Sequence, residues 1–183
     1  MADRVLVYGV TGSGKTTLAG RLADRTGSPW FSIDEVMWLP GWQEVPAQQQ
    51  RELVLTICAG ERWILDAAYG KWLDIVLARA DLIVALDYPR WISLGRLLRR
   101  TFVRIVTRPQ VCNGNIETLR VSLARDSIIV WHFRSFARKR ARIRAWAADP
   151  GGPAVVRLTS PRAARLWLAS LGSARATAPS DSP

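Results

Sequence analysis

Cysteine and histidine are scarce in this chain. Among 183 residues the only cysteines are Cys58 and Cys112, and the only histidine is His132. A disulfide framework needs several cysteines at short spacings, and a zinc site needs clustered cysteine and histidine ligands. The composition therefore excludes both and favours free thiols in the cytoplasm. A lone histidine in an aromatic and basic stretch is expected to be a surface or core residue rather than a catalytic base.

Long apolar runs and an amino-terminal leader are also missing. The longest apolar runs, such as residues 82–86, are far shorter than the roughly 20 residues that span a bilayer. A strand-like run begins at Val5, which leaves no room for a signal peptide. We therefore expect a cytoplasmic protein without a membrane partner, with one domain over residues 1–172 and a small, polar, disordered tail over 173–183.

Acidic residues are in the minority. Lysine and arginine together number 26 against 15 acidic residues, which gives a net charge of +11. Nearly all of this charge is arginine, because the lysines are Lys15, Lys71 and Lys139, and most of the excess lies between residues 90 and 144. Such a charge raises the question of nucleic acid, yet no helix-turn-helix, RNA-recognition or zinc-finger signature is present. Two interpretations stay open: a bias of composition towards arginine, and guanidinium groups that clamp phosphate.

What the chain does contain, near its amino terminus, is a glycine-rich phosphate-binding motif. Residues 9–17 follow an apolar run, precede a helix-like stretch and fit the P-loop pattern Gly-x-x-x-x-Gly-Lys-Ser/Thr. In such a loop the glycines let backbone N–H groups approach phosphate, the lysine reaches the β- and γ-phosphates, and the next hydroxyl ligates Mg²⁺. The alternative is a glycine-rich turn without a ligand, which does not account for the complete motif. The predicted nucleotide-binding residues are Gly9, Thr11, Gly12, Ser13, Gly14, Lys15, Thr16 and Thr17.

Strand-like and helix-like stretches alternate along the rest of the chain. Apolar runs bounded by turn residues predict strands at 5–8, 30–33, 62–66, 81–87 and 154–158. Helical spacing occurs at 16–26, 47–59, 72–80, 90–108, 116–148 and 161–171. Residues 37–42 contain a Pro-Gly turn and are expected to form a loop. This alternation predicts an α/β fold, a five-stranded parallel sheet with helices on both faces.

Three predicted strand ends carry an aspartate: Asp34, Asp66 and Asp87. Ligands of open parallel sheets bind beyond the carboxyl ends of the strands, and a P-loop enzyme needs a carboxylate there to hold Mg²⁺. A strand-end aspartate can equally cap a turn or a helix. The pattern alone does not choose among the three, although Pro89 makes a structural role as plausible as a functional one for Asp87.

The chain resembles the adenylate-kinase-like group of small P-loop kinases, and within it the family called topology modulation proteins. The resemblance extends from Val5 to about Leu171. Besides the P-loop, it rests on Ile33-Asp34, Pro40-Gly41-Trp42, Trp63-Ile64-Leu65-Asp66, Tyr69-Gly70, Ala80-Asp81, Leu86-Asp87-Tyr88-Pro89, Gly114-Asn115, Glu117, Asp126-Ser127 and Trp131. It implies a nucleoside- and nucleotide-kinase-like fold with an arginine-rich helical lid at about residues 96–116.

The resemblance gives two carboxylates a role. Asp66 matches the strand-three aspartate that positions Mg²⁺ through water in nucleotide kinases. Asp34 stands where related small-molecule kinases place an acceptor-binding carboxylate, which can orient or deprotonate an attacking hydroxyl. The family more often has a glycine and then a polar residue after the strand-three aspartate, where this chain has Ala67 and Ala68. That departure leaves these two positions without an expected polar role.

The resemblance also singles out two arginines, Arg96 and Arg100, which follow the Leu-Asp-x-Pro motif at the spacing of adenylate-kinase-like enzymes. Four residues apart on a helix, they share one face and can both reach a transferring phosphate. Arg99, Arg104 and Arg108 either extend a lid that closes over ATP or form a solvated basic face.

Aromatic and amide residues add weaker indications. Trp38 and Trp42 follow Asp34 and either stack on an acceptor or pack in the core, with core packing slightly favoured. Asn113, Asn115 and Glu117 either fix the hinge of the lid or serve as ordinary loop and cap residues.

Together these features predict a kinase that uses ATP and Mg²⁺ to phosphorylate a small-molecule acceptor, such as a nucleoside, a nucleotide or another metabolite. The alternative is a nucleic-acid-binding or regulatory ATP-binding protein that affects DNA topology. A signalling GTPase is a weaker option, because no Asn-Lys-x-Asp motif is present. The predicted catalytic residues are Lys15, Arg96, Arg100 and Asp34, and the predicted metal-binding residues are Thr16 and Asp66.

Overall fold

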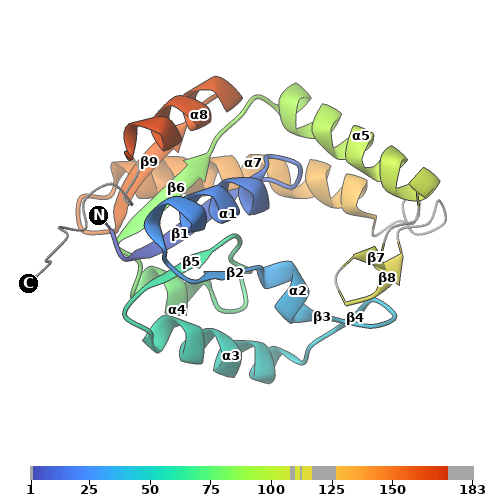
Figure 1. Ribbon diagram of the computed structural model, residues 1–183, viewed down its shortest axis with the longest axis horizontal. Helices are drawn as coiled ribbons and strands as arrows, with labels where there is room; N and C mark the ends of the chain where they lie inside the picture. The colour runs from blue at the N-terminus through green and yellow to red at the C-terminus, as the bar shows by residue number, and fades with distance from the viewer. Residues whose placement is uncertain (1, 108–109, 112, 117–126, 173–183) are drawn as a thin grey trace, which may run out of the picture.

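The computed structural model describes residues 2–107, 110–111, 113–116 and 127–172 (Figure 1). A parallel sheet lies at its centre, with helices packed against both faces. The strands of this sheet are β1 (Arg4–Gly9), β2 (Trp30–Phe31), β5 (Trp63–Leu65), β6 (Leu82–Leu86) and β9 (Ala154–Leu158). The helices are α1 (Lys15–Thr26), α2 (Ile33–Met37), α3 (Ala47–Ala59), α4 (Leu73–Leu77), α5 (Arg90–Thr107), α7 (Ile128–Ala148) and α8 (Pro161–Ser170).

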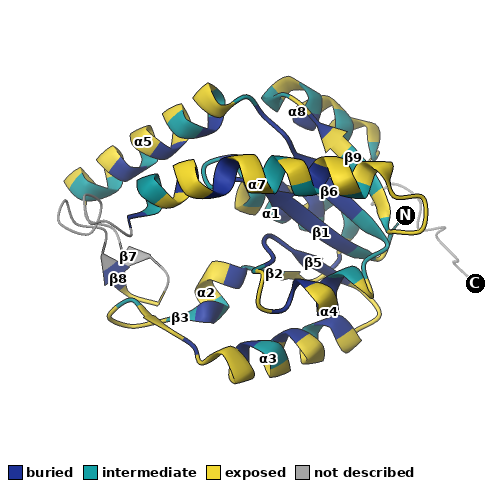
Figure 2. Ribbon diagram, turned by 180° about the vertical axis from the view of Figure 1, so that it is seen from behind, coloured by how far each residue is buried: buried dark blue, intermediate teal, exposed yellow. Residues whose placement is uncertain are grey.

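The sheet has the strand order β2-β5-β1-β6-β9, and every neighbouring pair is parallel. This confirms the predicted five-stranded α/β fold. Strand β1 lies at the centre and is buried on both faces, as the dark blue strands of Figure 2 show. Its side chains alternate: Leu6 and Tyr8 point to one face, while Val5 and Val7 point to the other. All five strands end at the same edge, which is where ligands of such sheets bind.

Each face of the sheet has its own layer of helices. Buried side chains of α1 and α8, such as Leu18 and Leu168, pack on the face of Val5 and Val7. Helices α2, α3, α4 and α7 cover the opposite face with Tyr8. The two layers therefore approach the carboxyl edge of the sheet from opposite sides, α1 from one and α2 and α7 from the other.

Local signals explain the helix ends that were predicted well. Helix α1 stops at Gly27, whose φ of 67° lies in the left-handed region that glycine adopts without strain. Helix α8 begins at Pro161 after Ser160, whose hydroxyl accepts a hydrogen bond from the N–H of Ala163. Helix α3 has the bounds that the helical spacing predicts.

The segment after β2 differs from the prediction. A strand was expected over 30–33 and a loop over 37–42, but β2 stops at Phe31 and α2 follows, then a small hairpin of β3 (Trp38–Leu39) and β4 (Gln43–Glu44). The N–H of Ile33 donates to the carboxylate of Asp66 at 2.9 Å, which ends the strand. Asp34 therefore stands in the first turn of a helix and not at a strand end.

The segment that was expected to form a lid also differs in part from the helical prediction. Helix α5 is followed by a hairpin of β7 (Gln110–Val111) and β8 (Asn115–Ile116). The long helix expected from residue 116 does not begin there, because Ile116 is in β8. Helix α7 begins after Ser127, whose hydroxyl accepts from the N–H of Val130. The predictions for Cys112, Arg108, Glu117 and the tail at 173–183 fall outside the described residues.

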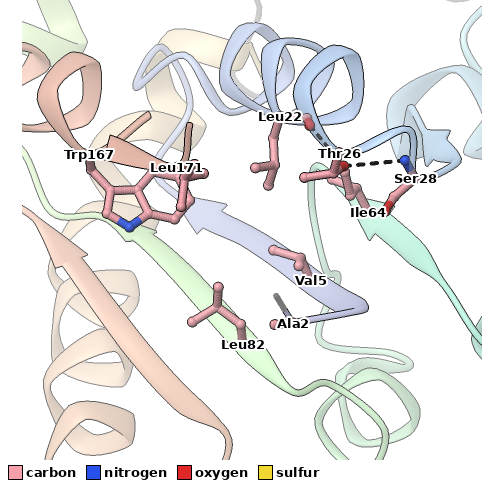
Figure 3. A pocket seen from close by; sticks show the side chains of 9 residues that line it. All are labelled: Ala2, Val5, Leu22, Thr26, Ser28, Ile64, Leu82, Trp167 and Leu171. Atoms are coloured by element: carbon pink, nitrogen blue, oxygen red, sulfur yellow. Dashed lines mark hydrogen bonds between the residues drawn. The ribbon is translucent and has the colours of Figure 1, made fainter. Parts of the chain in front are cut away.

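A small apolar pocket lies at the end of the sheet opposite to the carboxyl edge (Figure 3). Its volume is about 20 Å³, enough for about one water molecule. It is lined by Ala2, Val5, Leu22, Thr26, Ser28, Ile64, Leu82, Trp167 and Leu171. None of these side chains ionises at neutral pH, so we regard this pocket as a gap in packing. Among the described helices, none is long and apolar enough to cross a membrane.

Candidate active site

The P-loop is folded around one carbonyl oxygen, that of Val10. The N–H of Ser13 donates to it at 3.2 Å, the hydroxyl of Ser13 at 2.7 Å and the ammonium of Lys15 at 3.2 Å. Ser13 is buried, and its hydroxyl is bonded within the loop. This arrangement turns the chain from the end of β1 into α1 and leaves the loop on the carboxyl edge of the sheet.

Two glycines of the loop are required by geometry. Gly12 has a φ of 80°, and a Cβ on it would lie 2.3 Å from the carbonyl oxygen of Ser93 on α5. Gly14 has a φ of 94° and immediately precedes α1. Both conformations lie in the left-handed region that strains other residues. The loop thus touches α5 directly through its backbone.

The first turn of α1 has no side-chain cap. Its N–H groups, which lack partners within the helix, are therefore available to phosphate oxygens, and the positive end of the helix dipole favours an anion there. Thr16 and Thr17 lie in this turn and are exposed. Burial lowers the pKa of Lys15, and the nearby carboxylates of Asp34 and Asp66 oppose this effect.

Thr16 and Asp66 form a pair that suits a hydrated divalent cation. Asp66 is only 2% exposed, and burial raises its pKa, whereas hydrogen bonds from Ile33 and Thr16 oppose the rise. Oxygen ligands of this kind fit Mg²⁺, which keeps several waters and the phosphates of its nucleotide. Within the described ranges, no group of three histidine, cysteine or acidic residues is placed to hold a metal. A cation here would thus depend on the bound nucleotide for most of its ligands.

Asp34 lies on α2, across the carboxyl edge from the P-loop. The hydroxyl of Tyr69 donates to its carboxylate at 2.5 Å. Burial and the charge of Asp34 raise the pKa of Tyr69, so this hydroxyl keeps its proton and remains a donor. Asp34 itself is exposed to the cleft. A carboxylate held in this way can accept a proton from a hydroxyl group of a ligand.

Helix α5 carries the two predicted arginines to the P-loop. Arg96 donates to the carbonyl oxygen of Ser13 at 3.2 Å, and its guanidinium lies 5.7 Å from the centre of the Tyr88 ring. Arg100 lines the same cleft, and its charge lowers the pKa of Lys15. Arg104 also lines the cleft. Arg99 is exposed and is not among the cleft-lining residues, so it belongs to the solvated face of α5.

Helix α7 contributes residues that the sequence did not single out for the site. The Nζ atom of Lys139 donates to the carbonyl oxygen of Gly9 at 3.3 Å, and Arg142 donates to the hydroxyl of Tyr8 at 3.3 Å. Arg138 lines the cleft beside them. Basic residues at positions 138, 139 and 142 share one side of a helix, which was the available signal, but the same spacing is typical of solvated surfaces.

His132, also on α7, is buried against the P-loop. Its Nδ1 atom lies 3.1 Å from the carbonyl oxygen of Thr11, which can only accept, so Nδ1 carries the proton. Burial lowers its pKa, and the hydrogen bond to Thr11 opposes this. The histidine was expected on the surface or in the core, and it is a buried support of the loop.

Asp87 is occupied by structural partners. Its carboxylate is fully buried and contacts Arg140 at 2.6 Å and Arg157 at 2.7 Å. Both of its oxygens accept a guanidinium hydrogen bond. Of the three aspartates that the sequence left open, Asp34 thus lines the cleft, Asp66 lies buried against Thr16 of the P-loop, and Asp87 holds α7 and β9 together.

The β3–β4 hairpin forms a further wall of the cleft. Trp38 and Trp42 are half-buried and line the cleft, with ring centres 6.0 Å apart in an edge-on arrangement. The side-chain amide of Asn113 donates to the carbonyls of Glu35 and Trp38, both at 2.8 Å. Asn115 accepts from the N–H of Trp42 at 2.8 Å and donates to the carbonyl of Leu39 at 3.0 Å. The asparagines expected at the hinge of a lid therefore join the β7–β8 hairpin to this wall.

The P-loop, Asp34, Arg96, Arg100, the basic residues of α7 and the two tryptophans line one cleft of about 1980 Å³. A site for a single small molecule commonly measures about 300–1,000 Å³. The cleft therefore has room for a nucleotide on the P-loop and a second molecule beside Asp34.

Comparisons with known proteins agree with this architecture. No protein-family model matches the chain. A curated relative, the uncharacterized protein YqaC of Bacillus subtilis, is 31% identical over 107 residues, which are 57% of this chain and 60% of that protein. The match thus spans less than two thirds of the relative's length.

Solved structures share the fold over nearly the whole chain. A shikimate kinase from Acinetobacter baumannii in complex with shikimate is 18% identical, with a TM-score of 0.57 and coverage of 92% of this chain and 90% of that one. A sugar kinase from a Janibacter species is 18% identical, with a TM-score of 0.52 and coverage of 95% and 96%. A gluconokinase from Sinorhizobium meliloti is 16% identical, with a TM-score of 0.52 and coverage of 92% and 93%. The chain has the fold of the small P-loop sugar and shikimate kinases.

Proposed function

We propose that this protein is a kinase that transfers the γ-phosphoryl group of ATP to a hydroxyl group of a small molecule. The observation that carries the proposal is that the P-loop, the carboxylate of Asp34 and the guanidinium groups of Arg96 and Arg100 face the same cleft. Phosphoryl transfer depends mainly on positioning and on neutralising charge, and this set of groups provides both.

The acceptor side of the reaction is assigned to Asp34. An acceptor hydroxyl beside it would give its proton to the carboxylate as the oxygen bonds to phosphorus and the bond to the departing ADP breaks. The hydrogen bond from Tyr69 fixes the orientation of the carboxylate. Because Tyr69 donates to one oxygen, the other is left for the hydroxyl.

The donor side is assigned to the P-loop and α5. Lys15, the free N–H groups of α1 and the two arginines surround the place where the phosphates would lie. Thr16 and Asp66 would hold Mg²⁺, directly or through water, and the cation would neutralise phosphate charge when bound. The contact of Arg96 with Ser13 places its guanidinium at the loop itself.

The positive charge of the chain does not require nucleic acid as a partner. Eight basic side chains of α1, α5 and α7 line the cleft: Lys15, Arg21, Arg96, Arg100, Arg104, Arg138, Lys139 and Arg142. Their charge suits the phosphates of a nucleotide and an anionic ligand. We also propose that the chain belongs to the family of topology modulation proteins that it resembles, and the kinase-like fold agrees with this assignment.

The test is a screen for acceptor-dependent release of ADP. The purified chain is mixed with ATP, Mg²⁺ and a panel of polyols, sugar acids, nucleosides and nucleotides. We expect at least one compound to stimulate ADP release. Lys15→Ala should lower that rate by at least about 100-fold, since it removes a charge beside the phosphates. Asp34→Asn should lower it by about 100-fold or more while ATP still binds.

The matched control is Asp24→Asn, which changes an exposed aspartate on α1. It should leave the rate unchanged. Phosphorylation of the acceptor by Lys15→Ala at the wild-type rate, or an equal loss in Asp24→Asn and Asp34→Asn, would contradict the proposal.

A further inference from the structure

Helix α7 lines the cleft with Ile128 and Trp131 in its first turns and with three basic residues further along. We call Arg138, Lys139 and Arg142 the α7 basic face. All three line the cleft that contains Asp34. Lys139 reaches the carbonyl of Gly9 and Arg142 reaches the hydroxyl of Tyr8, so the face lies at the end of β1.

These cations have no carboxylate of their own. Within the described part of the chain, no ion pair involves any of the three. Arg140, on the same helix, makes one with Asp87 at 2.6 Å. Arg138 is exposed, whereas Lys139 and Arg142 are half-buried, and a cation that loses water without gaining a counter-charge is costly.

Among the three, Lys139 shows most clearly how the lack of a counter-charge changes the pKa of a cation. Burial, followed by the charge of Lys15, lowers its pKa from 10.5 to about 7. Arg138 and Arg142 lower it further, and only Asp34 opposes the shift. An anion placed against this amine would favour its protonated, charged form, and the charged amine would bind the anion more tightly.

The α7 basic face borders the P-loop through Lys139 and extends from there to the side of Asp34, whose charge also acts on Lys139. Tyr8 packs on the face of the sheet that carries Ile33 and Met37 of α2. Helix α1, which follows the P-loop, packs on the opposite face. The α7 basic face therefore lies on the side of Asp34, where the acceptor is expected.

We propose that the acceptor carries an anionic group, a carboxylate or a phosphate, which binds to Lys139 and Arg142 while a hydroxyl group of the same molecule lies against Asp34. Arg138 borders this subsite. The inference rests on the proposed kinase function and narrows its substrate class to hydroxylated acids and phosphate esters. Neutral sugars and nucleosides would leave the cationic pair without a partner.

The scarcity of lysine makes this testable by NMR. The chain has only Lys15, Lys71 and Lys139, so side-chain carbon-13 labelling of lysine gives one signal for each. The labelled protein is first saturated with Mg²⁺ and the analogue AMP-PNP, which occupies the P-loop. Inorganic phosphate or formate is then titrated at constant ionic strength. These minimal anions require no knowledge of the rest of the acceptor.

We expect either anion to shift the Lys139 signal in a saturable way and to raise the pKa of Lys139 by about one unit, a tenfold gain in proton affinity. Lys71, whose amine is paired with Glu44 at 2.8 Å, should not respond. Comparison of the two anions shows whether the subsite prefers carboxylate or phosphate. Arg142→Leu should weaken the dissociation constant by about tenfold or more, since it removes one charge-assisted partner. Arg144→Leu, an exposed arginine of the same helix, is the matched control and should have no effect.

The inference is overturned if Lys139 does not respond, if it responds only when AMP-PNP is absent, or if AMP-PNP alone raises its pKa, because Lys139 would then serve the donor. Equal weakening by Arg142→Leu and Arg144→Leu would overturn it as well. The Lys15 signal reports on the proposed function separately. If Mg²⁺ and AMP-PNP do not move it, donor binding itself fails, whatever Lys139 does.

Discussion

At the scale of single residues, three similar aspartates have three different surroundings. Asp34 is exposed to the cleft and accepts from Tyr69, Asp66 is buried beside Thr16, and Asp87 is enclosed by two arginines. The sequence pattern of an apolar run followed by aspartate is the same in each. The three aspartates differ in the partners that the fold brings to them. These partners come from segments that are distant in the sequence.

The first prediction concerns Asp87. Asp87→Asn should lower the free energy of unfolding by about 2–3 kcal/mol, because two hydrogen bonds to a charged group are weakened and two guanidinium groups lose their counter-charge. Urea denaturation measures this loss. Asp74→Asn is the control, because the ion pair of Asp74 with Arg51 is exposed. It should not move the urea midpoint measurably. Similar midpoints for the two variants would show that the buried carboxylate does not hold α7 to β9.

At the scale of elements, hydrogen bonds join the β7–β8 hairpin to the β3–β4 hairpin. Four hydrogen bonds run from Asn113 and Asn115 to the backbone of residues 35–42. Trp42 has a φ of 58°, a conformation that costs energy in a residue other than glycine. The bond from its N–H to Asn115 helps to hold it there.

The second prediction tests this connection. Asn115→Ala removes two hydrogen bonds of a buried side chain, each worth about 1 kcal/mol. The amide of Trp42 should then exchange with solvent deuterium about tenfold faster or more. Gln48→Ala, on the exposed side of α3, should leave that exchange unchanged. An unchanged exchange rate of the Trp42 amide in Asn115→Ala would mean that the β3–β4 hairpin keeps its shape without the bonds from Asn115.

Elements with strong local signals could be predicted from the sequence. Helix α3, strand β9 and the P-loop are marked by periodicity, turn residues and a complete motif, and all three stand where they were expected. Residues 33–44 could not be predicted in the same way. The strand stops because the N–H of Ile33 finds the carboxylate of Asp66, 33 residues further along the chain.

The sequence predicted residues on the proposed donor side and Asp34 on the proposed acceptor side, but it did not predict the basic residues of α7. Lys15, Arg96 and Arg100 belong to motifs with fixed spacing, and the structure brings them together at the P-loop. Lys139 and Arg142 belong to no motif. Their spacing on α7 is that of any basic helix surface, and only the packing of α7 beside the end of β1 turns it towards the cleft.

At the scale of the whole molecule, the charge of +11 is partly gathered into the cleft. Cations enter it from α1 and α5 and again from α7 on the other side. This arrangement attracts anions, but it also weakens the folded state when no anion is present.

The third prediction follows from this destabilisation of the folded state. Lys139 has a pKa of about 7 in the folded chain and an ordinary value of 10.5. Below pH 7 both states hold the proton, so the folded chain bears the full cost of the buried charge. Between pH 7 and pH 10.5 only the unfolded chain holds the proton on Lys139. The free energy of unfolding of the wild type therefore rises with pH in this range. Lys139→Met lacks this cost and should be more stable than the wild type below pH 7.

The difference in the free energy of unfolding between Lys139→Met and the wild type should shrink as the pH rises towards about 10. Urea denaturation at several values in this range measures it. Lys71→Met, at the surface, is the matched control and should show no comparable change. A gap for Lys139→Met that stays constant across the range would show that the amine is not perturbed.

The contact of Gly12 with the carbonyl of Ser93 has a consequence for anyone who redesigns this protein. The two segments meet backbone to backbone, so no change of rotamer can make room for a side chain at position 12. A library of variants that seeks a new acceptor should therefore keep Gly12 fixed. The positions to vary are Trp38 and Trp42, which line the cleft on the β3–β4 hairpin, away from the contact between Gly12 and Ser93.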